Sequence, residues 1–395
     1  MKITLLILLS ATISYNTVNA QTKQPQYISA AVGFYNLENL FDTIDDPKIA
    51  DEEFLPRSEK KYNTAAYYRK LNNMAQAIVG IGKDANPDGL ALLGVAEIEN
   101  ETVLQDLIAT DSLMARNYSY VHYQSPDERG IDVGLLYNPK YFTVISSRPH
   151  HVTLPNRHPT RDILVVTGDL VGDTVTVLVN HWPSRSGSSN RFDANNKNAA
   201  LNRNGRITID RVTGVTRQNV NELPDADGTQ LTGEEISRPN RAAAAKACMQ
   251  VIDSLQLLNP NAKIMIMGDL NDDPNSPSVK DIMAVQYNPA DVQPKGIYNS
   301  LGNYFIQGNG KLGTLAYRGK WNLFDQLMYT QPMLDKTQLN GWFVYSSHIY
   351  YRDFLINTTG DYKGYPKRSW VGNKWNNGYA DHLPVYSILV KAIAE

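Results

Sequence analysis

The sequence predicts a domain that mixes helices and strands, an α/β or α+β sandwich, on three observations. Short apolar runs end abruptly in carboxylates, amides or histidine, which is typical of buried strands with polar side chains at their carboxyl ends. Helical patterns separate these runs along the chain. Of the 395 residues, 42% are hydrophobic and 20% are charged, so the chain can bury a sizeable core.

Eight apolar runs predict strands. Four of them run directly into the polar residues Asn36, Glu97, His181 and Asp269 or their immediate neighbours. In one further run, the alternation of aromatic and polar residues favours an ordinary sheet strand over a membrane-seeking hairpin. The expected strands are residues 30–35, 90–96, 132–137, 175–179, 264–267, 323–329, the alternating run 342–351, and 384–390.

Two segments show helical spacing of apolar residues. In residues 64–81, Tyr68, Leu71, Met74, Ala75 and Ile78 fall on one face. The second helix is expected over residues 241–258, after start signals at positions 237 and 239.

The chain has one cysteine, Cys248, in the second of these helices. A single cysteine excludes an intramolecular disulfide, cysteine-rich zinc modules and CxxC redox chemistry. Its helical spacing with Ile252 and Leu255 favours a buried thiol over a reactive one.

The first twenty residues have the features of a signal peptide. Lys2 supplies a positive start, residues 3–13 are an apolar stretch, and small residues precede a cut before Gln21. This stretch is shorter than the ~20 residues that a membrane-spanning helix needs, and no cysteine near the cut could carry a lipid. The sequence therefore predicts a signal peptide over 1–20, a single domain over 21–395, and a secreted or periplasmic protein without an anchor.

Residues 187–236 depart from the pattern of strands and helices. They contain a single aromatic residue and no long apolar run, which predicts a surface insert. Within it, residues 187–217 carry six basic and two acidic residues, a local charge of +4, and an acidic stretch follows. A loop of this length is either functional or a flexible decoration, and a clamp on substrate phosphates would be one such function.

The whole-chain net charge of −2 gives no sign of a polyanionic partner, so a nucleic-acid site has to be a local patch. The polar residues at strand ends suit a metal-assisted phosphoester hydrolase. Glu97 can supply the carboxylate that a hard cation such as Mg²⁺ prefers, and Asp269 can accept a proton from water that Asn271 orients. Histidine can protonate or stabilise phosphate oxygens when a carboxylate orients it. His181, His382 beside Asp381, and Asp325 fit these roles.

Two other classes of enzyme lack their sequence signals. The chain has no Gly-x-Ser-x-Gly elbow for a serine hydrolase. It also has no Gly-rich loop ending in Lys-Ser or Lys-Thr, which a nucleotide-driven machine requires.

Six motifs, in order along residues 30–390, resemble the endonuclease/exonuclease/phosphatase superfamily, which has the fold of deoxyribonuclease I. The resemblance implies an α+β fold, a four-layer α/β/β/α sandwich of two mainly antiparallel sheets, with the active site where strand ends of both sheets converge. The motifs are Asn36-Leu37-Glu38-Asn39, Val95-Ala96-Glu97-Ile98-Glu99, Asn180-His181-Trp182-Pro183-Ser184-Arg185, Gly268-Asp269-Leu270-Asn271-Asp272, Phe324-Asp325-Gln326 and Ala380-Asp381-His382-Leu383-Pro384-Val385.

The resemblance also implies roles for individual residues. Glu97 would bind the catalytic Mg²⁺, or Mn²⁺ in its place, with Asn36 and Asp381 beside the metal, and Ca²⁺ is an accessory alternative. Asp269 and Asn271 would activate and position the attacking water, Asp325 would orient His382, and His181 would contact the scissile phosphate or the leaving group. Arg129 and Arg185 would bind substrate phosphate, although for Arg129 a structural salt bridge remains an alternative. Asp132 is expected to be structural.

These features predict a secreted metal-dependent phosphodiesterase, most simply a nonspecific endonuclease with DNA or RNA as its substrate. A phospholipid phosphodiesterase or a small-molecule phosphatase on the same catalytic core is the alternative. The absence of the inositol-phosphatase signature Trp-Cys-Asp-Arg at the Asp325 motif counts against that branch. A catalytically inactive binding module is disfavoured because every residue of the set is present. Nothing in the sequence points to a stable protein partner.

Overall fold

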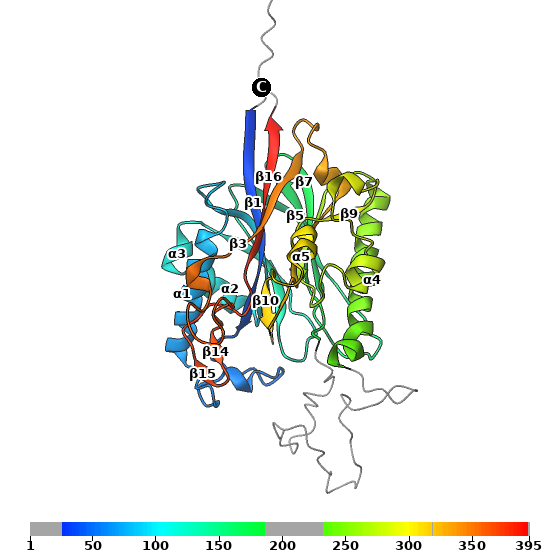
Figure 1. The fold of residues 1–395 in the computed structure, drawn as a ribbon. Helices are drawn as coiled ribbons and strands as arrows, with labels where there is room; N and C mark the ends of the chain where they lie inside the picture. Colours follow the sequence, from blue (N-terminus) through cyan, green and yellow to red (C-terminus); the bar gives the residue numbers. More distant parts are fainter. Residues whose placement is uncertain (1–25, 186–231, 318, 394–395) are drawn as a thin grey trace, which may run out of the picture.

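The computed structural model describes residues 26–185, 232–317 and 319–393 (Figure 1). The predicted signal peptide, residues 1–20, lies outside the described residues, as does nearly all of the predicted insert, including its basic stretch. Within the described ranges, no helix has the length and apolar character needed to cross a membrane.

The first sheet has six strands, and β1 pairs with β2 in parallel while every other neighbouring pair is antiparallel. In spatial order the strands are β13 (Trp342–Ile349), β16 (Val385–Ile393), β1 (Gln26–Leu40), β2 (Leu90–Ile98), β4 (Asp132–Tyr137) and β3 (Ser119–His122).

The second sheet also has six strands, and here β7 and β8 form the one parallel pair. In spatial order they are β5 (Phe142–His150), β6 (Ile163–Leu170), β7 (Thr174–His181), β8 (Ile264–Asp269), β12 (Asp325–Thr330) and β9 (Ile297–Asn299). Two-stranded ribbons are formed by β10 (Leu315–Tyr317) with β11 (Lys320–Asn322) and by β14 (Trp370–Val371) with β15 (Lys374–Trp375).

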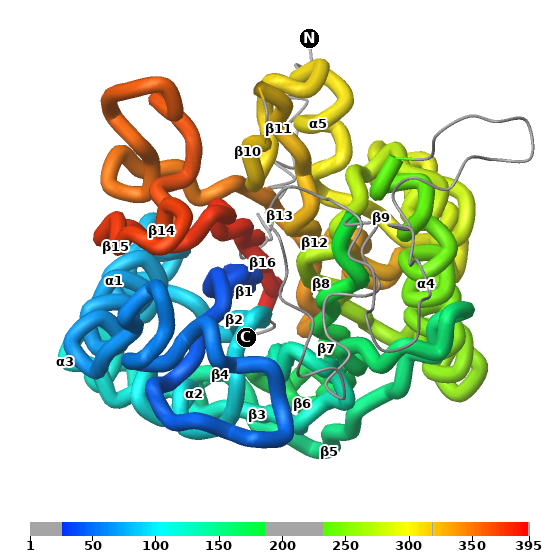
Figure 2. The backbone as a smooth tube through the Cα atoms, turned by 90° about the horizontal axis from the view of Figure 1, so that it is seen from below, coloured from blue at the N-terminus to red at the C-terminus, as the bar shows by residue number. Residues whose placement is uncertain are grey.

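The helices flank the two sheets, with α1, α2 and α3 beside the first and α4 beside the second (Figures 1 and 2). They are α1 (Thr64–Gly80), α2 (Glu101–Ile108), α3 (Asp111–Met114), α4 (Gly233–Leu258) and α5 (Gly302–Gly308). Short helical turns are η1 (Glu52–Phe54), η3 (Ser278–Ile282), η4 (Pro289–Asp291), η5 (Gln331–Leu334) and η6 (Asp353–Leu355).

Alternation along the strands divides the apolar side chains among three cores. In β1, Ala31 and Tyr35 face α1, whereas Val32 and Phe34 lie between the two sheets. In β7, Leu178 instead joins the core beneath α4. Three cores require four layers, so the expected α+β sandwich of two mainly antiparallel sheets between helices is confirmed.

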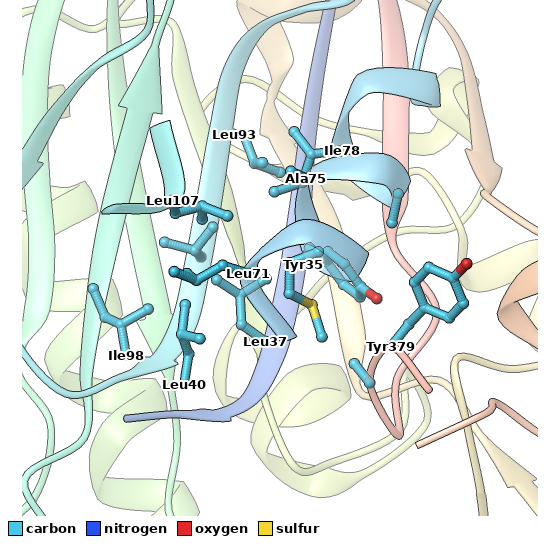
Figure 3. Close-up of a cluster of buried hydrophobic side chains, with 14 of the residues drawn as sticks. Tyr35, Leu37, Leu40, Leu71, Ala75, Ile78, Leu93, Ile98, Leu107 and Tyr379 are labelled. Carbon is cyan, nitrogen blue, oxygen red and sulfur yellow. The ribbon is translucent and has the colours of Figure 1, made fainter. Parts of the chain in front are cut away.

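Helix α1 shows how the sequence builds one of these layers. The Asn63 side chain accepts a hydrogen bond from the Ala66 amide and caps the helix. Leu71, Ala75 and Ile78 then pack against Tyr35 and Leu93 of the sheet (Figure 3). The expected apolar face needs one correction: Tyr68 is half exposed, and Tyr67, one turn before Leu71, is the buried tyrosine.

The second helix begins earlier than the sequence predicts. The expected start was residue 241, but α4 begins at Gly233, so the predicted insert does not extend to 236. Thr232 and Glu235 form a capping box, and Pro239 lies inside the helix. Proline at this position has no amide hydrogen to donate to the carbonyl of Glu235, four residues earlier, so α4 lacks one backbone hydrogen bond there. Cys248 is fully buried in the core beneath this helix, as expected.

Candidate active site

The expected site residues come from strands of both sheets, at or close to the carboxyl ends of those strands. Asn36 is in β1, Glu97 in β2, His181 ends β7 and Asp269 ends β8. Strand register places His181 directly opposite Asp269 on one side and Asp325 opposite it on the other. Asp269 is therefore at the centre of the arrangement.

Close packing of β7 against β8 supports this register. A Cβ atom on Gly268 would lie 2.2 Å from the carbonyl oxygen of Asn180, so this position has room only for glycine. The next residue pair along the two strands is His181 with Asp269. The glycine of the Gly-Asp-Leu-Asn motif thus allows the approach of the two catalytic candidates.

Three side chains surround one carboxylate oxygen of Asp269. Asn36 donates from Nδ2 to Asp269 Oδ2 at 3.0 Å. His181 Nε2 lies 3.7 Å and His382 Nε2 3.8 Å from the same oxygen. Burial raises the pKa of Asp269 to about 7, even though the nearby His382 opposes the rise.

Asn271 positions the other carboxylate oxygen. Its backbone amide donates to Asp269 Oδ1 at 2.9 Å, and its side-chain amide donates to the Trp182 carbonyl at 2.9 Å. Asn271 therefore links the ends of β7 and β8.

Glu97 is held from two sides by the end of β1. Asn36 Nδ2 lies 3.2 Å from Glu97 Oε1, and the Asn39 backbone amide donates to Glu97 Oε2 at 2.8 Å. The Asn36 amide oxygen is engaged by the Glu38 backbone amide at 2.9 Å. Asn36 thus presents its nitrogen to the two carboxylates.

The backbone around these carboxylates is strained. Glu38, Asn39, Glu97 and Asn271 all have positive φ, between 49° and 59°. Non-glycine residues rarely adopt this conformation, and such strain clusters at functional sites.

His382 is oriented by a carboxylate, as expected. Its Nδ1 lies 2.6 Å from Asp325 Oδ2, and both residues are buried. Burial disfavours the imidazolium, but the carboxylates of Asp325 and Asp269 outweigh it, so the pKa of His382 is raised well above its ordinary value.

His181 has the opposite electrostatics. Burial, assisted by the charges of Arg161, Arg129 and His382, lowers its pKa well below the ordinary value. Its Nε2 is also 3.8 Å from Glu97 Oε1, and its buried Nδ1 has no partner among the described residues. The site thus contains one histidine with a raised pKa, His382, and one with a lowered pKa, His181.

Arg161, which the sequence analysis did not identify, supports the His181 loop. This buried side chain donates to the carbonyls of His181 at 3.2 Å and Trp182 at 2.6 Å, and it pairs with Asp127 at 2.9 Å. The sequence around Arg161 did not indicate this role, because its partners come from distant segments, the end of β7 and the loop before β4.

A second missed group lies behind Glu97. Buried Lys70 of α1 donates to the carbonyl oxygens of Glu38 and Asn39, the latter at 2.8 Å. Burial lowers the pKa of Lys70 to about 8 and raises that of Glu38 to about 7. The motif containing Glu38 was recognised, but Lys70 is one polar residue on an otherwise apolar helix face.

Asp381 lies at the rim of the site. Its Oδ1 is 4.0 Å from His382 Nε2, and its Oδ2 accepts from Arg368 at 2.8 Å. Arg368 also donates to Glu38 Oε1 at 3.0 Å, so it links the loop before β16 to the end of β1.

The two arginines expected to bind phosphate have protein partners. Arg129 donates to Asn39 Oδ1 at 2.7 Å, beside the amide that holds Glu97, and it forms no salt bridge with another residue that the structure describes. Arg185 lies over the Phe324 ring and pairs with Asp273 at 3.0 Å and, more distantly, with Asp272 and Glu234. Asp132 contacts His122 at 2.9 Å and Ser125 at 2.5 Å, neither of which is an expected site residue.

The donor atoms near Asp269 fit a divalent metal. Glu97, His181 and Asp269 each offer a ligand atom, all within 4.8 Å of one another. Two carboxylates and no thiolate suit a hard cation, and Glu97 retains some exposure to solvent. Asp269, Asp325 and His382 form a second such group within the described residues.

Several solved structures are similar in fold. An endonuclease/exonuclease/phosphatase family protein from Bacteroides thetaiotaomicron is 12% identical with a TM-score of 0.48, covering 93% of this chain and 97% of its own. The human Nocturnin catalytic domain is 12% identical with a TM-score of 0.47, covering 93% and 96%. TDP2 from Caenorhabditis elegans is 14% identical with a TM-score of 0.46, covering 92% and 97%. At these scores the likenesses say nothing about substrate.

The family comparison is decisive. No curated protein matches the chain. The model of the endonuclease/exonuclease/phosphatase family matches residues 31–221 and 216–391, which together span all the site residues described above. The chain therefore belongs to the endonuclease/exonuclease/phosphatase family, whose members are phosphoric ester hydrolases.

Proposed function

We propose that the protein is an exported, divalent-metal-dependent phosphodiesterase that cleaves nucleic acid, most simply a nonspecific endonuclease. The observation that carries this proposal is the environment of Asp269. One buried carboxylate faces Asn36, His181 and His382 within 4 Å, with Glu97 beside them. In-line hydrolysis of a phosphodiester needs a proton acceptor, a proton donor and a cation site in this proximity.

Asp269 is proposed to accept the proton of the attacking water. A general base works best when its pKa is near the working pH, and burial raises the pKa of Asp269 to about 7. Asn271 assists by holding Asp269 Oδ1 through its backbone amide. This contact leaves Oδ2 directed toward the histidines.

His382 is proposed to stabilise negative charge on the phosphate. Its Nδ1 donates to the Asp325 carboxylate, and because the raised pKa of His382 keeps the ring protonated, Nε2 also carries a proton toward the space beside Asp269. His181, whose pKa is lowered, is proposed to hydrogen-bond the scissile phosphate or to assist the leaving oxygen. The different proton affinities of the two imidazoles suit two different roles.

Glu97 is proposed as the main ligand of Mg²⁺, with Mn²⁺ as a substitute and Ca²⁺ as an accessory ion. When bound, such a cation neutralises charge on the phosphate and lowers the pKa of coordinated water. Asn36 is proposed to act beside the metal by orienting Glu97 and Asp269 through its amide nitrogen. Asp381 is proposed to lie at the outer side of the same cation site.

Nucleic acid is the proposed substrate because cationic groups border this edge of the sheets. Arg129 is bonded to the residue whose amide holds Glu97, and it is proposed to contact phosphate. Arg185 is also proposed to contact phosphate, and to do so it would have to break one of its ion pairs with a neighbouring carboxylate. The +4 stretch of residues 187–217 follows His181 in sequence, and it is proposed to bind phosphates without reading bases. Export is proposed on the signal-like residues 1–20.

A substrate panel tests this proposal. The purified protein would be incubated with supercoiled plasmid, RNA, bis(p-nitrophenyl) phosphate, p-nitrophenyl phosphate and sphingomyelin, each with Mg²⁺ or with chelator. We expect metal-dependent cleavage of nucleic acid and of the diester reporter. Turnover of lipid or monoester alone would overturn the nuclease assignment, and the absence of any turnover with Mg²⁺, Mn²⁺ and Ca²⁺ would overturn the enzymatic one.

A further inference from the structure

A buried ion pair joins the two sheets beside the strand ends that carry the site. Arg161 lies two residues before β6 of the second sheet, and Asp127 lies in the loop between β3 and β4 of the first. Arg161 Nη1 donates to Asp127 Oδ2 at 2.9 Å, and the two side chains are only 7% and 6% exposed. Neither side chain has a role in the chemistry proposed above.

On the second sheet, the other nitrogens of Arg161 hold the end of β7. Nε donates to the His181 carbonyl at 3.2 Å, and Nη2 donates to the Trp182 carbonyl at 2.6 Å. The Trp182 carbonyl also accepts from the side chain of Asn271, whose backbone amide holds Asp269. Because a guanidinium fixes the directions of its donors, this one side chain sets the position of the strand end that carries His181.

On the first sheet, Asp127 holds the loop that reaches Glu97. Its Oδ1 accepts from the Arg129 backbone amide at 3.0 Å. The Arg129 side chain donates to Asn39 Oδ1 at 2.7 Å, and the Asn39 backbone amide donates to Glu97 Oε2 at 2.8 Å. A continuous series of contacts therefore runs from Glu97 to Asp127 and, through the ion pair, to the end of β7.

The proposed cation site depends on the separation of the sheets, because its donor atoms come from both. Glu97 belongs to β2 of the first sheet, whereas His181 and Asp269 end strands of the second. Glu97 Oε1 lies 3.8 Å from His181 Nε2, and ligand atoms of all three residues lie within 4.8 Å of one another. Divalent cations hold oxygen ligands at about 2 to 2.6 Å, so a small change in separation would remove a ligand.

Stability alone does not account for an ion pair in this position. The cost of removing two charges from water largely offsets their attraction, and well-packed apolar residues often stabilise such a position equally well. Arg161 and Asp127 supply a fixed geometry instead. The donors of one guanidinium fit a single arrangement of the carboxylate and the two carbonyls.

We propose that the Arg161–Asp127 pair sets the separation of the two sheets at which Glu97 and His181 share one divalent cation. This inference rests on the proposed function and adds two positioning residues to it. Neither residue touches the cation or the substrate. Arg161 acts through the end of β7, and Asp127 acts through the loop that reaches Glu97, so loss of the pair lowers cation affinity.

Asp127→Asn is the mildest test. Both carboxylate oxygens of Asp127 accept hydrogen bonds, and asparagine replaces one of these acceptors with a donor, so one contact is lost. Mn²⁺ affinity is measured by electron paramagnetic resonance without substrate, and kcat/KM with bis(p-nitrophenyl) phosphate at subsaturating Mg²⁺. We expect both to fall about 10- to 100-fold, as for other residues that orient metal ligands.

Arg161→Lys tests whether geometry or charge is responsible. Lysine keeps the positive charge but loses the fork, so its ammonium cannot meet the carboxylate and both carbonyls in the same directions. We expect Mn²⁺ affinity to fall as it does in Asp127→Asn. Wild-type affinity in Arg161→Lys would show that a charge alone suffices, and it would overturn the positioning role.

An apolar replacement of the whole pair separates positioning from folding. Arg161→Met combined with Asp127→Leu leaves neither partner as an unpaired buried charge, so this protein should fold even where a single variant does not. We expect it to bind Mn²⁺ as weakly as Asp127→Asn. Recovery of wild-type affinity would overturn the inference, because the loss in the single variant would then come from an unpaired charge.

The opposite ends of β7 and β8 offer a matched control. There, buried Lys263 pairs with Asp173, and Asp173 Oδ2 also accepts from the Trp342 backbone amide of the first sheet at 2.9 Å. Asp173→Asn should lower stability to urea without changing Mn²⁺ affinity or kcat/KM. An equal loss of Mn²⁺ affinity in Asp173→Asn and Asp127→Asn would assign the effect to general destabilisation and overturn the inference.

The wild-type protein separates failure of the inference from failure of the proposed function. Wild-type protein that binds no Mn²⁺ and cleaves no diester would overturn the proposed function and, with it, the inference. If the wild type binds Mn²⁺, unchanged affinity in folded Asp127→Asn and in the apolar double variant would overturn the inference alone. This comparison needs no turnover, so it holds whichever phosphoester is the substrate.

Discussion

Asp269 and the residues around it show how neighbouring side chains of the same type acquire different chemistry. His181 and His382 both approach Asp269 Oδ2, but only His382 has a carboxylate on its other nitrogen. The pKa of His382 is raised while that of His181 is lowered. The sequence could place both histidines at strand ends. It could not show their different proton affinities, because those depend on Asp325, Arg161 and burial in the folded chain.

The variant Asp325→Asn tests the origin of the His382 charge. The Asp325 carboxylate favours the imidazolium, so its replacement by a neutral amide should make His382 lose its proton at a lower pH than in the wild type. We also expect at least a hundredfold loss in rate, as for other general acid–base contributions. NMR titration of the imidazole and kcat/KM measurements check both effects. A His382 titration that does not move toward lower pH would contradict this account.

Lys70 gives a second prediction at the residue scale. It binds the carbonyls of Glu38 and Asn39, two residues with positive φ, and so supports the amide that holds Glu97. Lys70→Met should destabilise the protein by about 1–3 kcal/mol because two buried carbonyls lose their donor. It should also weaken metal activation, measured as the Mg²⁺ concentration at half-maximal rate. Lys83→Met, at an exposed position after α1, is the control; equal Mg²⁺ dependence in both variants would remove Lys70 from this role.

Individual elements were predicted unevenly, and burial explains only part of the difference, because β6 (Ile163–Leu170) is largely buried and was not predicted. Central strands such as β2 and β8 are buried on both faces, so their continuous apolar runs were identified. The edge strand β5 exposes much of its length and left no such run. The start of α4 was placed too late because Pro239 was taken as a start signal, whereas the capping box at Thr232 begins the helix. When a sequence contains two possible start signals for a helix, the packing of the folded chain determines which one is used.

Helix α4 allows a prediction about its buried cysteine. Burial raises the pKa of Cys248 to about 12, so the thiol is neutral at all lower pH values and the reactive thiolate is scarce at pH 8. We expect the native protein to resist Ellman's reagent at pH 8 and to react with one equivalent after unfolding in guanidinium chloride. Rapid labelling of the native protein would show that the face of α4 that carries Cys248 is not packed against the second sheet.

Core packing beneath α1 gives a matched prediction on stability. Leu71 is fully buried between α1 and the first sheet (Figure 3). Leu71→Ala should lower the free energy of unfolding by about 2–5 kcal/mol through lost burial and a cavity. Tyr68→Ala, three residues away and half exposed, should cost much less. Urea unfolding followed by circular dichroism compares the two, and equal costs would contradict the orientation assigned to α1.

At the scale of the whole molecule, the topology assembles the site from residues far apart in sequence. Glu38 and Arg368 are separated by 330 positions, and Asn36 and Asp269 by 233. Family motifs could identify the members of the site, but the pairing of Arg368 with Glu38 and Asp381 follows only from the meeting of β1 with the loop before β16.

The central claim is that Asp269 and its partners hydrolyse phosphodiester bonds of nucleic acid with the help of a divalent cation. Nicking of supercoiled plasmid tests it most directly, with wild-type protein, Asp269→Asn, and Asp253→Asn, an exposed carboxylate on α4, as the control. We predict nicking by wild type and Asp253→Asn with Mg²⁺, its loss with chelator, and at least a hundredfold lower rate for Asp269→Asn. Nicking that persists in chelator, or a loss of tenfold or less in Asp269→Asn, would contradict the account.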